Sequence, residues 1–253
     1  MRLRIVVEIN FEDAVKAGAE GFWFTTGTIV LVFALGTLLS RFLKVETKIS
    51  HLISAGTAIC GGSAIAAISP VIKADAKQTS VALGVVFLLN ALALFVFPVL
   101  GIWLNMSQNQ FGIWSAIAIH DTSSVVGAAS KFGDEALQIA TTVKLARALW
   151  IIPLALVFSY IFNRGKAKIT LPYFIFYFIL AILAGTYLPF LEEVKPIISS
   201  ISKGFLKLAL FFIGTALSVK LLKTIGMRPL LLASLLWLVV SLTSLWVIFL
   251  FIE

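Results

Sequence analysis

GTAICGGSAIAA (residues 56–67) and AIAIHDTSSVVGAA (residues 116–129) are the two stretches that decide the fold of this chain. Both place small and polar residues inside a sequence that is otherwise strongly apolar. Aligned at an offset of 60, Ala58-Ile59-Cys60 falls on Ala118-Ile119-His120. We interpret the stretches as two copies of one element. A polar, glycine-containing element repeated at membrane depth indicates a binding site.

The composition indicates that this chain lies in a membrane. Hydrophobic residues make up 60% of the 253 residues and charged residues only 13%, with a mean hydropathy of +1.05. Soluble domains hold about a quarter charged residues, so we expect an all-α polytopic protein of the cytoplasmic membrane. Six apolar runs approach or exceed the roughly 20 residues that cross the hydrocarbon core. They cover residues 22–43, 79–104, 136–162, 171–190, 197–219 and 229–252.

The net charge of +8, from 20 basic and 12 acidic residues, has a membrane explanation. Cytoplasmic loops of membrane proteins are enriched in Lys and Arg, so we expect no nucleic-acid partner. The chain also has no GxxxxGK[ST] phosphate loop, which argues against ATP-driven transport by this chain.

The charges also bear on the path of the two polar elements, taken as residues 52–72 and 111–130. If both elements cross the membrane, the loop Lys and Arg residues divide nine to seven between the two sides. If both dip in and return, Lys73 and Lys77 change sides and the division becomes eleven to five, a stronger cytoplasmic bias. Re-entrant elements separated by one span would enter from opposite faces. We therefore favour an inverted-repeat transporter fold with two discontinuous or re-entrant helices, without deciding between the two paths.

Glycine and hydroxyl residues supply the first candidate ligands. Gly61 and Gly62 let a ligand approach the main chain, and Ser63 can cap a helix or donate a hydrogen bond. The second copy offers Thr122, Ser123 and Ser124. These six are predicted to bind substrate, with close helix packing by small residues as the alternative.

His120 and Asp121 are the titratable residues of the second copy. We expect one of them to couple transport to H⁺ or Na⁺, because polar groups at membrane depth are expensive unless they face a cavity or each other. A catalytic triad is not expected from immediate sequence neighbours, so no catalytic or metal-binding residue is assigned. Cys60, the only cysteine, is interpreted as a small packing residue.

Two basic residues lie inside the predicted span 136–162. Lys144 and Arg147 are three residues apart and so share one helical face, where they can attract an anion or pair with Asp121. The alternative is that they snorkel to the interface. Asn90 stands alone in another apolar span, where it can bond across helices or line the path.

These residues also carry a family resemblance. HLISAGTAICGGSAIAAISPVIKA (51–74), FGIWSAIAIHDTSSVVGAA (111–129) and VKLAR (143–147) resemble the YeiH-type sulfate exporter family, over about residues 3–250. The resemblance implies a secondary transporter related to the cation-antiporter and bile-acid-symporter group. Members usually begin with several more helices, so the N-terminal helices of the family are expected to be absent from this single transmembrane domain (1–253). A match of residues 9–18 with 217–226 agrees, since only the later copy follows a full helix.

The function expected is secondary active export of a small anion, such as sulfate or an organic sulfonate or carboxylate. Alternating access would move a site that lies between the two polar elements, with Arg147 and Lys144 balancing the charge of the anion. A passive anion channel is the alternative, followed by an intramembrane hydrolase or a structural partner subunit. The partners expected are the anion and the lipid bilayer, with a homo-oligomer left open, and no cofactor apart from the coupling ion.

Overall fold

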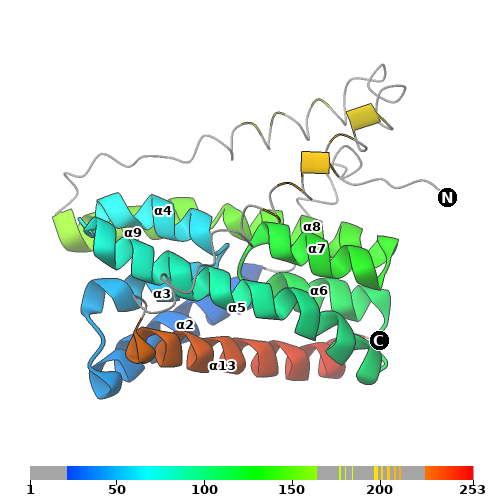
Figure 1. The fold of residues 1–253 in the computed structure, drawn as a ribbon, viewed down its shortest axis with the longest axis horizontal. Coiled ribbons are helices and arrows are strands. Elements are labelled where there is room, and N and C mark those ends of the chain that lie inside the picture. The colour runs from blue at the N-terminus through cyan, green and yellow to red at the C-terminus, as the bar shows by residue number, and fades with distance from the viewer. Residues whose placement is uncertain are drawn as a thin grey trace.

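In the computed structural model, the structure describes residues 22–163 and 226–252, with a few isolated positions between 177 and 211. Every element within these residues is a helix, which confirms the all-α prediction (Figure 1). The helices are α2 (Phe22–Leu43), α3 (Thr47–Ala58), α4 (Gly62–Val71), α5 (Ala76–Trp103), α6 (Gln108–Ala118), α7 (Thr122–Phe132), α8 (Asp134–Ala148), α9 (Ile151–Asn163) and α13 (Met227–Phe251).

Four helical segments of the described residues are long and apolar enough to cross a membrane: Thr25–Leu43, Ala76–Trp103, Asp134–Phe162 and Met227–Phe251. They coincide closely with the predicted spans 22–43, 79–104, 136–162 and 229–252. Large apolar side chains lie exposed on them, as lipid-facing surfaces require. The protein is therefore a multi-pass membrane protein. The predicted spans 171–190 and 197–219 lie outside the continuously described residues, as does the match between residues 9–18 and 217–226.

The span predicted at 136–162 is not one uninterrupted helix. α8 ends at Ala148 and α9 begins at Ile151, and the backbone N–H of Ile152 donates to the carbonyl of Leu149 at 3.2 Å. Pro153 explains the interruption, because it has no N–H to donate to that carbonyl and its ring would clash with it. The predicted span is confirmed in its extent, Asp134–Phe162, with this turn inside it.

α3 and α4 form a re-entrant hairpin, called here the first hairpin. The Lys48 Nζ at the start of α3 donates to the carbonyl of Lys73, just beyond the end of α4, at 2.7 Å. The two ends of this element therefore lie on the same side of the bundle. The element begins at Thr47, earlier than the predicted residue 52.

α6 and α7 form the second hairpin in the same way. The ring of Phe111 in the first turn of α6 stacks on Phe132 at the end of α7, with centroids 3.9 Å apart. The Gln108 Oε1 also accepts from the backbone N–H of Glu135 and of Ala136, just after α7. The hairpin spans residues 108–132 and is longer than the predicted 111–130.

The two hairpins enter from opposite ends of the bundle. α5 connects them, starting at a capping box of Asp75 and Gln78 beside the end of α4. It finishes beside the start of α6, where Gly101 lies against the ring of Phe111. A helix of 28 residues is about 42 Å long, enough to cross the hydrocarbon core. Figure 1 shows α3 and α4 at one end of α5, and α6 and α7 at the other. Of the two paths considered from the sequence, the structure has the re-entrant one.

The remaining helices enclose the hairpins. α8 packs against α6 and α7, and α13 packs against α2, α3, α5 and α6. Small residues allow close approach where α2 meets α3: the Ser50 Oγ donates to the carbonyl of Gly36 at 2.9 Å. The buried core therefore surrounds the points where the hairpins turn.

Candidate functional site

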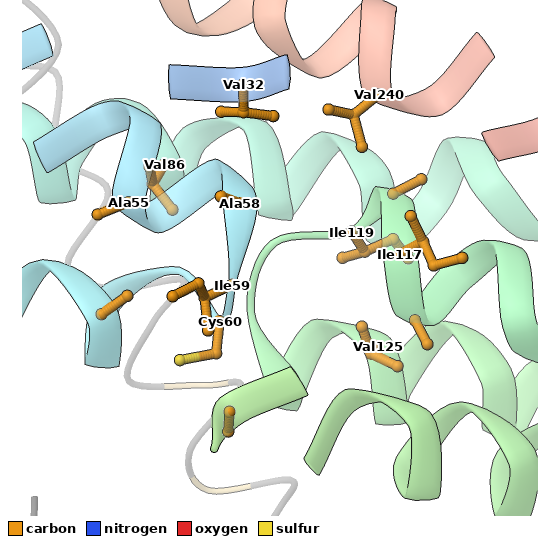
Figure 2. Packing of buried hydrophobic residues seen from close by; sticks show 14 of the residues in the cluster. Val32, Ala55, Ala58, Ile59, Cys60, Val86, Ile117, Ile119, Val125 and Val240 are labelled. Carbon is orange, nitrogen blue, oxygen red and sulfur yellow. The ribbon is translucent and has the colours of Figure 1, made fainter. Parts of the chain in front are cut away.

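The tips of the two hairpins meet in the centre of the bundle. α3 ends at Ala58 and α6 at Ala118, so the helix breaks correspond at the same offset of 60 as the sequence stretches. The first tip is Ile59-Cys60-Gly61 and the second is Ile119-His120-Asp121. Ile59, Cys60 and Ile119 belong to one buried cluster, and Figure 2 shows them on the two segments that turn there.

Gly61 of the first tip lies against the backbone of the second tip. A Cβ added there would stand 3.2 Å from the Cα of Asp121 and 3.3 Å from the carbonyl carbon of His120. The φ of Gly61 is +64°, a backbone conformation that side chains disfavour. Both the turn and the contact between tips therefore require glycine; the close approach expected of a ligand is made at Gly61 by the backbone of the second tip.

Lys144 neutralises the C-terminal end of α6. Its Nζ donates to the carbonyl oxygens of Ile119 at 2.7 Å and Ala116 at 3.2 Å. The last carbonyls of a helix have no partner within the helix and carry the negative end of its dipole. The Lys144 side chain is 0% exposed, and it is stabilised by its hydrogen bonds to these carbonyls and by the negative end of the helix dipole.

Arg147 neutralises the C-terminal end of α3. Its Nη2 donates to the carbonyl of Ala58 at 2.6 Å, and the residue is 2% exposed. One face of α8 thus supplies one cation to each hairpin; the three-residue spacing predicted the shared face but not these partners. The snorkelling alternative is wrong for both residues, because both are buried.

The N-terminal end of α7 is capped from within the chain. The Asp121 Oδ2 accepts from the backbone N–H of Ser123 at 3.0 Å and of Ser124 at 3.4 Å. The Asn90 Oδ1 accepts from the N–H of His120 and of Asp121 at 3.1 and 3.3 Å. A carboxylate at a helix N-terminus is favourable, so this half of the site already contains its own anion.

α4 differs from α7 at the equivalent position. Gly61 occupies its N-cap and makes no side-chain hydrogen bond. Gly62 is partly exposed and Ser63 is exposed at the first turn of α4. The N-terminus of α4 therefore lacks the carboxylate oxygen that Asp121 gives to α7, and the Cys60 thiol hydrogen-bonds there instead with the backbone of Ala64 and the side chain of Ser63.

Several buried polar atoms near the tips have no hydrogen-bond partner within the part of the chain described. They are both ring nitrogens of His120, Nε and Nη1 of Arg147, Nδ2 of Asn90, and the hydroxyls of Thr57 and Ser54. Buried polar groups are nearly always paired, and leaving one unpaired costs about 1–3 kcal/mol. This set consists mainly of donors. Apart from Ser54, which faces Gly36 of α2, its residues lie at the helix breaks or hydrogen-bond to them.

The predicted site residues fall into three groups. Gly61, His120 and Asp121 meet at the tips, and Lys144 and Arg147 bind the ends of the broken helices. Among the predicted hydroxyl ligands, Thr122 and Ser123 are partly exposed and Ser63 is exposed, while Ser124 is buried at 2%. Cys60 is buried at 1%, in agreement with a packing role.

The sequence left two contributors unassigned to the site. Asn90 was predicted to bond across helices or to line the path, and the first alternative is confirmed, because its Oδ1 accepts from two backbone N–H groups of the second tip. The Nε1 of Trp237 donates to the carbonyl of Ala118 at 3.0 Å, from a helix more than 100 residues away in the sequence. The lone amide in an apolar span was a usable signal for Asn90, whereas Trp237 had none.

Comparisons with known proteins place this chain among membrane proteins. The family model described as Conserved hypothetical protein 698 matches residues 4–233. A UPF0324 membrane protein of Bacteroides thetaiotaomicron is 50% identical over 239 residues, which is 94% of this chain and 72% of that protein. Another, from Shewanella oneidensis, is 52% identical over 237 residues, or 94% of this chain and 75% of that protein.

Solved structures give no corresponding match. The family model nevertheless covers most of the chain, and the relatives are aligned over most of their own length. The chain therefore belongs to the Conserved hypothetical protein 698 family, together with the UPF0324 membrane proteins.

Proposed function

We propose that this protein is a secondary active transporter that exports a small anion by alternating access. The observation that carries the proposal is the meeting of two re-entrant tips, with Lys144 and Arg147 buried behind them. Irregular backbone at membrane depth is tolerated only where it is buried in protein or lines a water-filled cavity, and carriers with broken helices bind substrate at such places.

The charge balance at the tips favours an anionic substrate. Each helix end contributes about half an elementary charge, positive at an N-terminus and negative at a C-terminus. The two N-termini and two C-termini therefore cancel. Lys144 and Arg147 together exceed the one carboxylate of Asp121, which leaves one net positive charge in a buried region.

The donors at the tips suit an oxyanion. The first turn of α4, which no carboxylate caps, presents the backbone of Gly62 and the hydroxyl of Ser63. Arg147 keeps two unpaired nitrogens, Nε and Nη1, which carry three N–H donors, and its planar guanidinium matches a carboxylate, sulfonate or sulfate. His120 and Asp121 are proposed to couple transport to a cation gradient.

The opposed entry of the hairpins supports alternating access. Each tip reaches the site from one end of the bundle, so each hairpin can separate the site from one side of the membrane. Because the helix breaks correspond at an offset of 60, we propose that the hairpins are the inverted halves of one ancestral element.

From the distribution of charged residues we propose an orientation in the cytoplasmic membrane. Within the described residues, the end where the first hairpin enters carries Arg41, Lys44, Lys48, Lys73, Lys77 and Arg228, while Lys131 lies at the other end. Cytoplasmic loops carry the excess of Lys and Arg. The first hairpin would therefore enter from the cytoplasm and the second from outside.

Anion binding to the purified protein tests the substrate class. Sulfate, small sulfonates and small carboxylates are titrated against the wild type, Arg147→Lys and Lys131→Met. Arg147→Lys can keep the charge and the bond to Ala58, but it removes the Nε and Nη1 donors, so we expect weaker binding. Lys131 is exposed beside the ring of Phe95 and serves as the control with unchanged affinity. The proposal fails if no anion binds, or if Arg147→Lys binds as tightly as the wild type.

Counterflow in proteoliposomes separates a carrier from a channel. A carrier preloaded with unlabelled anion accumulates labelled anion transiently, and its rate saturates with concentration. A channel shows a flux without exchange. That result would contradict the carrier and favour a passive anion channel.

A further inference from the structure

The C-terminal ends of α3 and α6 lie where a cation-coupled carrier would hold its ion. In transporters with discontinuous helices, the unwound carbonyls and the C-terminal ends of half-helices coordinate the coupling Na⁺ or H⁺. Both ends are negative and buried here, so the protein needs positive charge at both places.

Side chains already provide that charge at the second tip. The carbonyls of Ala116 and Ile119 accept from the Lys144 Nζ, and the carbonyl of Ala118 between them accepts from the Nε1 of Trp237. An ammonium group is a compact, strongly hydrated point charge, as is a small metal cation. Three carbonyls at the end of α6 are therefore occupied by donors.

The first tip follows the same arrangement. The Ala58 carbonyl accepts from Arg147 at 2.6 Å, and the Gly56 carbonyl accepts from the backbone N–H of Gly61 at 2.9 Å. A guanidinium does not lose its proton in proteins. Its positive charge at the end of α3 is therefore permanent.

We infer that Lys144 and Arg147 are built-in cations that stand in place of a coupling Na⁺ at the two hairpin tips. Anion transport then proceeds without Na⁺, and of the two coupling ions considered only the proton is retained. The independence of transport from Na⁺ rests on the proposed function. The filling of the two cation sites by Lys144 and Arg147 concerns the fold alone and can be tested without transport.

Thermal unfolding of the purified protein tests the cation sites. The wild type is melted in NaCl, KCl and choline chloride at equal ionic strength, and we expect equal melting temperatures. Lys144→Met removes the charge and frees the carbonyls of Ala116 and Ile119. We expect this variant to melt lower than the wild type and to gain a saturable stabilisation by Na⁺, about 2–4 °C at a concentration about fivefold above its Kd.

Matched variants make the result specific. Lys144→Arg keeps a cation at the end of α6 and should show no response to Na⁺, and Lys131→Met, at an exposed position, should also show none. Arg147→Met makes the same test at the first tip if Lys144→Met does not fold. A Na⁺-specific stabilisation of the wild type overturns the inference, as does a folded Met variant that responds to neither Na⁺ nor Li⁺.

Anion affinity measured with and without Na⁺ separates the two proposals. Equal affinity in NaCl and choline chloride supports Na⁺-independent transport, and a Na⁺-dependent affinity overturns it. If no anion binds in either salt, the proposed function is wrong, while the melting data still decide whether the cation sites are filled by side chains.

Discussion

Gly61 at the tip of the first hairpin lies directly against the backbone of Asp121 at the tip of the second, and a Cβ at residue 61 would stand 3.2 Å from the Cα of Asp121. This approach joins two segments that enter the bundle from opposite ends. A shift of either tip is therefore transmitted to the other.

Replacing Gly61 by Ala should destabilise the protein. The φ of +64° strains any side chain, at a cost of order 1–3 kcal/mol, and the neighbouring backbone leaves no room to relax. Gly27→Ala is the matched control, because a Cβ added at Gly27 would meet nothing within 4 Å and alanine favours a helix. Thermal unfolding in detergent should show a lower melting temperature for Gly61→Ala alone. Equal melting of the two variants would contradict the tip contact.

Asp121 has two separable roles, the cap of α7 and the carboxylate charge. Asn caps a helix about as well as Asp, whereas Ala removes the cap at a cost of about 0.5–2 kcal/mol. Asp121→Asn should therefore melt close to the wild type and Asp121→Ala below it. If the charge couples transport, Asp121→Asn loses concentrative uptake in proteoliposomes. Wild-type uptake by Asp121→Asn would leave Asp121 only a structural cap.

Trp237 should stabilise the second hairpin through its bond to Ala118. Trp237→Phe keeps an aromatic ring beside Phe97 but removes the donor, with an expected loss of about 0.5–1.5 kcal/mol. Trp246 lies on the same helix and is 66% exposed, so Trp246→Phe should change little. Melting temperatures of the two variants measure the difference, and a larger effect at Trp246 would speak against this role.

Cys60 provides a built-in probe of the first tip, because it is the only cysteine in the sequence. It is 1% exposed, so a maleimide should react with it slowly. Ser63 is exposed three residues later, and Ser63→Cys in a Cys60→Ser background should react much faster. Saturating anion should slow that reaction if Ser63 lines the site. Labelling of Cys60 after unfolding in detergent verifies that its thiol is intact. Fast labelling of Cys60 in the native protein would contradict its burial at the tip.

Residue type and spacing were enough to predict several features. The apolar runs predicted four of the helical segments within a few residues, because about 20 apolar residues are needed to cross the hydrocarbon core. The offset of 60 placed both helix breaks at corresponding residues, since glycine and polar residues are tolerated at membrane depth only in special settings. The interruption near Pro153 was readable but was not predicted.

The hydrogen-bond partners of the buried polar side chains could not be predicted from the sequence. Spacing showed that Lys144 and Arg147 share a face, but the carbonyls they bind lie 25 to 89 residues away. Asn90 likewise bonds to a tip 30 residues further along. Such pairs depend on how the helices pack, and composition carries no information about packing.

That this protein lies in a membrane, and where its helices break, could be predicted from the residues alone, because both depend on side-chain polarity and backbone freedom at each position. The packing of the helices established that the polar elements are re-entrant and meet tip to tip. It also decided that Lys144 and Arg147 on α8 face inward to the helix ends rather than outward. Both outcomes follow from burial, because a helix end or a charge inside the bundle is stable only where the chain itself supplies a partner.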